Sequence, residues 1–330
     1  MSTGFVHDAR YLLHATADLP ERPDRVTAIG DELARTGLLA RLTPIEPYPA
    51  PRELLELVHD AEYLDRLQAA CAALEPGESA RFDEEDVVIC HESWETALLS
   101  AGGGLALCDA VMEHRVENGF ANIRPPGHHA ERHRAMGFCL LANAAIAARH
   151  MQVRHGLKKI AIVDWDVHHG NGTQHILESD PSVLFISLHQ VPCYPGTGLA
   201  RERGRGKGRG FTLNIPMHPG STDVHYRKAF AAKILPALHK FAPEALIISA
   251  GFDAHMDDPL AEINLTTEAF GWMTRQLKNI AHTYCQGRLI SLLEGGYNLE
   301  SLAQSGRAHI EVLAEHTPEE KLMHWKSGTY

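Results

Sequence analysis

The sequence predicts an α/β protein in which helices cover both faces of a parallel sheet. Strand-like and helix-like segments alternate along the chain. The strand-like segments are almost continuously apolar, which is typical of parallel strands that are buried on both faces. No linker-like stretch and no repeat divides the 330 residues. We therefore expect a single domain over residues 1–330.

The expected elements can be placed in chain order. Segments with strand composition end in polar or glycine residues, and they span residues 119–125, 158–166, 182–189, 244–253 and 288–296. Helical patterns span residues 94–114, 137–156, 223–241 and 266–287. We expect Pro236 to kink the third helix, because proline has no amide hydrogen. The fourth helix should begin at a threonine cap and end at Gly287.

Composition and charge exclude several classes of protein. The six cysteines form no C-x-x-C pair, so neither a disulfide framework nor a structural zinc knuckle is expected. A net charge of −11 disfavours a general nucleic-acid binder. The basic, glycine-rich segment 201–210 should be a mobile, solvated loop. With no signal peptide and no apolar run near the ~20 residues of a membrane span, we expect a cytoplasmic protein.

Polar side chains follow four of the five predicted strands, where each strand ends. They are His128, His129, Asp164, Asp166, His168, Asp253 and Tyr297. In parallel α/β folds, ligands bind beyond the carboxyl ends of the strands. These side chains are therefore expected to meet at one edge of the sheet and to form one site.

Asp166, His168 and Asp253 have the ligand types that a divalent transition metal prefers, with no thiolate among them. Three protein ligands leave one position open for water, which is the arrangement of a catalytic site. The metal would lower the pKa of that water and polarise a bound carbonyl. A loop rich in hydrogen bonds is the alternative for the D-x-D-x-H pattern alone. The other polar strand ends favour the metal.

A metal-bound water needs a base, and the leaving group needs an acid; a histidine can serve as both. Of the adjacent His128 and His129, we expect one to face the water, with Asp164 and Asn171 as candidate orienting partners. Tyr297 could stabilise an oxyanion, and a core tyrosine is the alternative. The absence of a G-x-S-x-G element disfavours a serine hydrolase. Hydrogen-bonding or loop roles are expected for His133, His169, His175, His189 and His255.

Five long motifs occur in order: RPPGHHAERHRAMGFC, DWDVHHGNGTQ, SLHQVPCYPGTG, SAGFDAHMDDPL and LLEGGYN. Together they resemble the zinc-dependent histone deacetylase family. The likeness is greatest to its class II branch and its bacterial relatives, including acetylpolyamine amidohydrolases and acetoin-utilisation-type proteins. The resemblance runs from near residue 12 to about residue 300. It implies an arginase-like three-layer fold, with an eight-stranded parallel sheet between helices.

The resemblance implies two metal sites. One Zn²⁺ per chain would be bound by Asp166, His168 and Asp253. A structural K⁺ would lie nearby, bound through backbone carbonyls and side-chain oxygens. Its matching positions are Asp164, Asp166, His168, Ser187 and Leu188.

The resemblance also implies the catalytic roles. His129 would be the general base and acid, and His128, paired with Asp164, its electrostatic partner. Tyr297 would donate a hydrogen bond to the acetyl oxygen. Asn171 stands where class I members carry an aspartate. Because an amide cannot stabilise an imidazolium as a carboxylate does, Asn171 should stabilise the protonated form of His129 differently from that aspartate.

The implied substrate tunnel is lined by Gly137 and Phe138, with Tyr194 opposite. Leu260 follows "DDP", where some polyamine-directed relatives have an acidic gate, and this weakens a polyamine assignment. Asp86 is a candidate for the family's acidic rim residue. One further departure is that the usual "HPERP" is "LPERP", with Leu19 in the first place.

These observations predict a Zn²⁺-dependent amidohydrolase that removes an acetyl or similar acyl group from acyl-lysine or a related long-chain amine. The expected partner is an acetylated lysine peptide or protein, or an acetylated small amine, with no nucleic acid and no membrane. An acetylpolyamine deacetylase is the main alternative. A binuclear manganese ureohydrolase is disfavoured, because its second metal needs additional carboxylates. A D-x-H-x-D run would supply one, but here Asp166-Val-His168 is followed by His169 and Gly170. A non-catalytic acyl-amine binding protein is disfavoured, because no ligand, base or oxyanion residue is missing.

Overall fold

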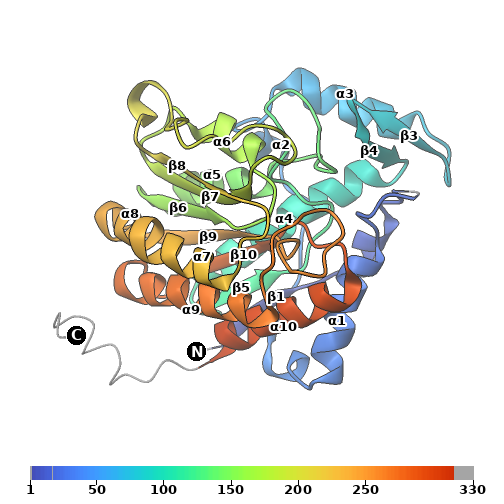
Figure 1. The fold of residues 1–330 in the computed structure, drawn as a ribbon. Helices are drawn as coiled ribbons and strands as arrows, with labels where there is room; N and C mark the ends of the chain where they lie inside the picture. Colours follow the sequence, from blue (N-terminus) through green and yellow to red (C-terminus); the bar gives the residue numbers. More distant parts are fainter. Residues whose placement is uncertain (1, 17, 316–330) are drawn as a thin grey trace.

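An eight-stranded sheet, parallel throughout, forms the centre of the protein (Figure 1). The computed structural model describes residues 2–16 and 18–315. Within them the strand order is β2-β1-β5-β10-β9-β6-β7-β8. The strands are β1 (Thr3–Val6), β2 (Thr43–Ile45), β5 (Asn118–Ala121), β6 (Ile160–Asp164), β7 (Val183–Gln190), β8 (Thr212–Met217), β9 (Ala245–Ala250) and β10 (Leu289–Leu293). Strands β3 (Ser79–Phe82) and β4 (Glu84–Cys90) form a separate antiparallel hairpin. The predicted fold class is confirmed.

Helices cover both faces of the sheet (Figure 1). One layer holds α1 (Asp24–Arg35), α7 (Asp223–Ala229), α8 (Leu235–Phe241), α9 (Thr267–Tyr284) and α10 (Leu299–Ala314). The other holds α2 (Arg52–Leu55), α3 (Ala61–Ala72), α4 (Ser93–Met112), α5 (Asn143–His155) and α6 (Asn171–Leu177). Short 3₁₀ turns are η1 (Ala9–Leu13), η2 (Leu39–Arg41) and η3 (Gly206–Gly208). None of these helices is long and apolar enough to cross a membrane.

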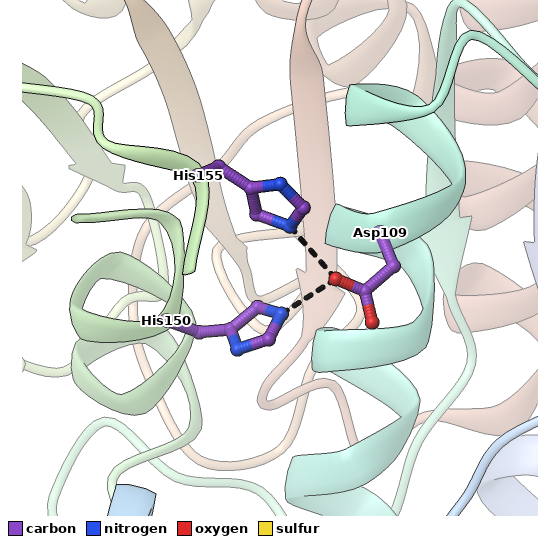
Figure 2. Close-up of side chains that lie close together, drawn as sticks. All are labelled: Asp109, His150 and His155. Carbon is purple, nitrogen blue, oxygen red and sulfur yellow. Dashed lines mark hydrogen bonds and ion pairs between the residues drawn. The ribbon is translucent and has the colours of Figure 1, made fainter. Parts of the chain in front are cut away.

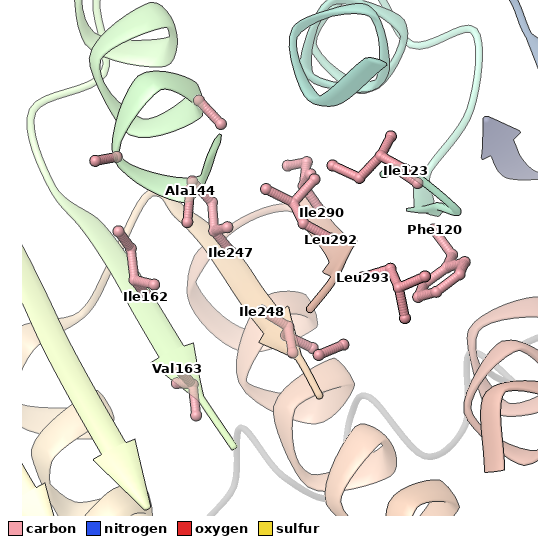
Figure 3. Packing of buried hydrophobic residues seen from close by; sticks show 14 of the residues in the cluster. Phe120, Ile123, Ala144, Ile162, Val163, Ile247, Ile248, Ile290, Leu292 and Leu293 are labelled. Carbon is pink, nitrogen blue, oxygen red and sulfur yellow. The ribbon is translucent and has the colours of Figure 1, made fainter. Parts of the chain in front are cut away.

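Successive residues of the central strands point to opposite faces, and both faces are buried. In Figure 3, Ile247 of β9 points toward Ala144 of α5, whereas Ile248 points to the other side. Leu292 and Leu293 of β10 divide in the same way, and all of these side chains are fully buried. This double burial is the physical reason why the strands are continuously apolar.

Two predicted helices differ in detail. The segment expected at 137–156 becomes helical only at Asn143, because Gly137 and Phe138 have left-handed backbone with φ of 56° and 66°. The segment 223–241 contains a π turn, η4 (Phe230–Ile234), directly before the first turn of α8, which holds Pro236. A π turn relieves the clash that proline makes with the preceding helical turn. The irregularity expected at Pro236 is therefore present as a π turn directly before α8.

The basic segment 201–210, expected to be a mobile and solvated loop, packs its backbone against the end of α6. The carbonyl of Glu178 accepts a hydrogen bond of 2.7 Å from the amide of Arg205. Gly208 is buried against the same carbonyl. Lys207, Gly206 and Gly210 of this segment are left exposed to solvent.

The strand register brings the polar strand ends to one place. Asp164, the last residue of β6, pairs with Ser187 of β7 and with Ser249 of β9. Because the strands are parallel, their carboxyl ends share one edge of the sheet. Asp166 follows the end of β6 and Asp253 follows the end of β9, so both lie at this edge of the sheet.

Candidate active site

Asp166, His168 and Asp253 lie together at the carboxyl edge of the sheet. Nδ1 of His168 is 3.1 Å from Oδ1 of Asp166 and 3.1 Å from Oδ2 of Asp253. Each residue offers one ligand atom, and these atoms all lie within 4.8 Å of one another. Both carboxylates are fully buried, and His168 is 8% exposed. The ligand set expected from the sequence is thus brought together.

The surroundings of these carboxylates fit a bound divalent cation. Burial and the charge of Asp166 raise the pKa of Asp253 to about 7, so the pair is costly when it has no positive partner. One oxygen of each carboxylate is already held by backbone. The amide of Gly295 donates to Oδ2 of Asp166 at 2.7 Å, and that of Val167 to Oδ1 of Asp253 at 2.9 Å. The other oxygen of each carboxylate converges with His168 Nδ1, as the ligands of a Zn²⁺ site do, and that of Asp166 also accepts from the amide of His168 at 2.9 Å.

Gly295 is the residue that lets the ligand carboxylates approach the loop after β10. A β-carbon at this position would lie 2.2 Å from Oδ2 of Asp253 and 2.5 Å from Oδ2 of Asp166. Both distances are far below van der Waals contact, so any side chain here would displace the ligands. The first glycine of "EGGYN" is therefore needed for space beside the metal site.

Asn171 determines which nitrogen of His129 carries the hydrogen. The amide Nδ2 of Asn171 donates to the Glu131 carboxylate at 2.6 Å, so its Oδ1 is the atom 2.7 Å from Nδ1 of His129. An amide oxygen only accepts, so Nδ1 must donate and Nε2 keeps its lone pair. Burial, together with His128 and His168, holds the pKa of His129 well below its usual value. His129 is therefore a neutral base whose lone pair is on Nε2.

His128 has the opposite environment, although its ring centroid is only 4.0 Å from that of His129. Its Nδ1 donates to Oδ2 of Asp164 at 3.0 Å. Burial alone would lower the pKa of His128, but Asp166 and Asp164 outweigh burial and raise it to about 10. A bound metal would take up part of the Asp166 charge, which leaves Asp164 as the lasting partner. The two adjacent histidines are thus set in different protonation states.

Glu294 holds the histidine loop in place, and its role was missed from the sequence. This fully buried carboxylate accepts hydrogen bonds from the amides of Gly127, at 2.7 Å, and His128, at 3.1 Å. The hydroxyl of Ser249 donates to its other oxygen at 3.0 Å. Burial raises its pKa to about 7. The available signal was an acid directly after a buried strand, the same signal that identified Asp164.

Tyr297 is positioned through its backbone and its ring. Its amide donates to Oδ2 of Asp258 at 2.7 Å, and the guanidinium of Arg25 lies 5.0 Å from its ring centroid. Burial raises the pKa of the phenol well above 10, so its hydroxyl keeps its hydrogen at neutral pH. Arg25 is fully buried and also donates to the carbonyls of Glu294 and Gly296. Arg25 and Asp258 were not identified from the sequence, although Asp258 lies in the SAGFDAHMDDPL motif.

The residues expected to line a tunnel surround this site. The ring of Tyr194 stands perpendicular to that of His129, 5.1 Å between centroids, and Phe138 lies 5.8 Å from Tyr297. Gly137 donates from its amide to Asp86 at 3.2 Å, and burial, together with the charge of Asp86 and a hydrogen bond to it, raises the pKa of Tyr194. Asp86 thus lies beside Gly137 and Tyr194, and its role as the rim residue stays a prediction.

Leu260 also lies at this end of the molecule. Its amide donates to Oδ1 of Asp258 at 3.0 Å, while Oδ2 of the same carboxylate holds Tyr297. The Leu260 side chain is 38% exposed. An apolar residue thus stands beside the loop that carries the phenol.

His169 is adjacent to the ligand His168, but both its nitrogens are used elsewhere. Nδ1 bonds with Oγ1 of Thr197 at 2.7 Å, and Nε2 with Oε1 of Gln174 at 2.9 Å. It therefore has no nitrogen directed at the metal ligands.

For the expected K⁺ site, Asp164 and Ser187 are register partners at the ends of β6 and β7. This neighbouring position is compatible with the site, which stays a prediction.

Comparison with known proteins supports the same assignment. The family described as "Histone deacetylase domain" matches residues 19–313. The chain is 41% identical, over 303 residues, to "Probable deacetylase" of Archaeoglobus fulgidus, covering 91% of this chain and 82% of that protein. It is 42% identical, over 300 residues, to "Polyamine deacetylase HDAC10" of Homo sapiens, covering 89% of this chain and 44% of the human protein.

A solved structure shares the fold over nearly the whole chain. The "Crystal Structure of HDA15 HD domain" superposes with a TM-score of 0.89 at 42% sequence identity, covering 95% of this chain and 88% of that one. The family resemblance inferred from the motifs is thereby confirmed. The chain belongs to the histone deacetylase family and is an enzyme, a hydrolase of amide C–N bonds.

Proposed function

We propose that the chain uses one Zn²⁺ to hydrolyse the amide bond of an acetylated or similarly acylated lysine, or of a related long-chain amine. The observation that carries the proposal is the meeting of a metal-ligand trio, a base of fixed tautomer and a neutral phenol. The trio is Asp166, His168 and Asp253, the base is His129, and the phenol is Tyr297.

When bound by the trio, the metal would act as a Lewis acid that polarises the acyl carbonyl and lowers the pKa of water. His129 takes a proton from the attacking water on Nε2, because Asn171 keeps the other hydrogen on Nδ1. The hydroxyl of Tyr297 donates to the acyl oxygen as negative charge develops there. His129 then passes its proton to the amine nitrogen as the C–N bond breaks. The products are acetate and the free amine.

His128 keeps a positive charge beside the reacting centre. Its hydrogen bond to the buried Asp164 carboxylate stabilises the protonated ring. This charge opposes protonation of His129 in the resting enzyme and favours negative charge on the substrate oxygen. We assign to His128 an electrostatic role and no proton transfer.

An acetylpolyamine substrate is the second candidate. The human relative is named a polyamine deacetylase, and the tunnel mouth carries the carboxylate of Asp86 beside Tyr194. Leu260 at the rim offers no charge to a cationic chain, which favours acyl-lysine. A structural K⁺ at Asp164 and Ser187, a single domain and a cytoplasmic location remain parts of this proposal.

The test is a side-by-side measurement of kcat/KM for an acetyl-lysine peptide and for acetylated polyamines, using zinc-loaded protein. We expect the peptide to be the better substrate. Replacing Leu260 with glutamate should shift the ratio toward the polyamine by about 10-fold or more. Val224→Glu, which introduces the same charge at an exposed site on α7, is the matched control. Turnover of neither substrate would contradict the proposal.

A further inference from the structure

A second group of metal-ligating side chains lies between α4 and α5 (Figure 2). Asp109 comes from α4, and His150 and His155 come from α5. Nε2 of His150 is 2.6 Å, and Nε2 of His155 is 2.8 Å, from the same oxygen, Oδ1 of Asp109. Figure 2 shows both imidazole rings directed at this oxygen. Three ligand atoms from two packed helices therefore converge on one point.

This Asp109 cluster is remote from the active site. Helix α4 ends at Met112, shortly before β5 begins at Asn118, and α5 ends at His155, shortly before β6 begins at Ile160. The ends of both helices therefore lie near the edge of the sheet where its strands begin. Asp166 and Asp253 lie at the opposite edge, where the strands end. The cluster thus cannot share a metal with the catalytic ligands.

The residues around the cluster orient its carboxylate. The hydroxyl of Tyr48 donates to Oδ2 of Asp109 at 2.8 Å, which leaves Oδ1 facing the two rings. Such a bond, from a neighbour to the outer oxygen of a ligand, is typical of metal sites. The side chains of His150, His155 and Asp109 are 6%, 15% and 20% exposed. The site is therefore sheltered but has a path to solvent.

We propose that Asp109, His150 and His155 bind a second divalent transition-metal ion, with Zn²⁺ the best match to two imidazoles and a carboxylate. In a tetrahedral zinc site, neighbouring ligand atoms are roughly 3.3 Å apart, given bonds of about 2.0 Å. The present separations from Oδ1, 2.6 Å for His150 and 2.8 Å for His155, need to widen by about 0.7 and 0.5 Å. Water would fill the fourth position. The metal would link α4 to α5.

The ring of His150 makes one hydrogen bond, from Nε2 to Asp109. Its Nδ1 is buried and has no hydrogen-bond partner within residues 2–16 and 18–315. The ring is therefore held through Nε2 alone, by one bond to a carboxylate that also serves His155. A metal bond at Nε2 would hold the ring far more strongly than a shared hydrogen bond.

The test is the zinc content of protein equilibrated with Zn²⁺ and then dialysed, measured by mass spectrometry of the metal. We expect two zinc ions per wild-type chain and one in His155→Gln, with deacetylase activity retained. Asp253→Ala should also bind one, and the double variant none. His218→Gln, which changes an exposed histidine outside both sites, should keep both ions.

Thermal unfolding gives an independent readout. Zn²⁺ should raise the Tm of Asp253→Ala, in which the Asp109 cluster is the remaining site, and should not raise that of Asp253→Ala/His155→Gln. A single zinc ion in the wild type, or two in His155→Gln, would overturn the proposal. Catalytic failure with two zinc ions bound would instead count against the proposed function.

Discussion

His129 depends on residues that never touch the substrate. Glu131 accepts from the amide of Asn171 and so turns the Asn171 oxygen toward Nδ1 of His129. The sequence pattern indicated Asn171 as a candidate partner of a histidine. It could not indicate Glu131, because the orientation of an amide depends on a three-dimensional contact and not on spacing along the chain.

We predict that Glu131→Gln lowers kcat by about 10- to 100-fold and leaves KM nearly unchanged. A glutamine can present its NH₂ group to Asn171, which allows that amide to flip and to offer NH₂ to His129. The measurement is kcat against pH with zinc content checked. His175→Gln removes the other side chain bonded to Glu131 and should keep at least half of the activity. Full activity of Glu131→Gln would show that the tautomer of His129 is set in another way.

At the scale of elements, the sequence predicted the central strands well and the others poorly. Strands β5, β6, β7, β9 and β10 are continuously buried and were identified from composition. Strands β1, β2 and β8 of the sheet were missed, as was the hairpin of β3 and β4. β2 and β8 are the edges of the sheet, and β1 and β2 have only four and three residues. Short runs, and edge strands with one exposed side, do not show the apolar continuity of buried strands.

Helix α4 was predicted despite its three successive glycines, and the structure gives the reason for one of them. A β-carbon at Gly102 would lie 1.5 Å from the carbonyl oxygen of Tyr48, which is rigid backbone. At Gly104 the nearest atom is 3.3 Å away, at the end of the Leu292 side chain. The chain before α2 therefore passes directly over α4 at Gly102. The same segment carries the hydroxyl that orients Asp109.

We predict that Gly102→Ala lowers the free energy of unfolding by at least about 2 kcal/mol. The overlap with Tyr48 outweighs the ~1 kcal/mol that alanine gains over glycine in a helix. Gly104→Ala is the matched control and should stay within about 1 kcal/mol of the wild type. Both are measured by chemical denaturation. Equal stability of the two variants would mean that the chain at Tyr48 moves away without cost.

At the scale of the whole molecule, many of the 22 histidines are core residues with no catalytic role. His309 is fully buried between Thr274 and Ser291, and burial lowers its pKa to about 3. His59 is buried and its pKa is lowered to about 4. Histidine is the side chain suited to metal binding and proton transfer near neutral pH. Burial, which composition does not reveal, decides which of them are neutral core groups.

These lowered pKa values predict sensitivity to acid. Below pH 6.5 the unfolded chain binds protons at these histidines, while the folded chain does not until about pH 4 or 3. The free energy of unfolding should therefore fall as pH drops from 6.5 to 4, by about 1.4 kcal/mol per pH unit for each such group. His309→Gln should reduce this slope by about that amount in denaturation curves. An unchanged slope would show that His309 is protonated in the folded protein.

The meeting of these residues was largely predictable, because the proposed ligands, base and phenol follow strand ends in long motifs. The residues that hold them, such as Glu294 and Arg25, were missed because their roles depend on contacts between distant loops. The proposed function requires that Tyr297 and the metal trio act on the same acyl group.

The most direct test is kcat/KM for an acetyl-lysine peptide with Tyr297→Phe, compared with wild-type protein of the same measured zinc content. Tyr284→Phe on α9 is the matched control. We predict a loss of about 100- to 1,000-fold for Tyr297→Phe, because an oxyanion donor is removed while the zinc ligands are intact. Activity within a few-fold of the wild type, with zinc retained, would contradict the proposed function.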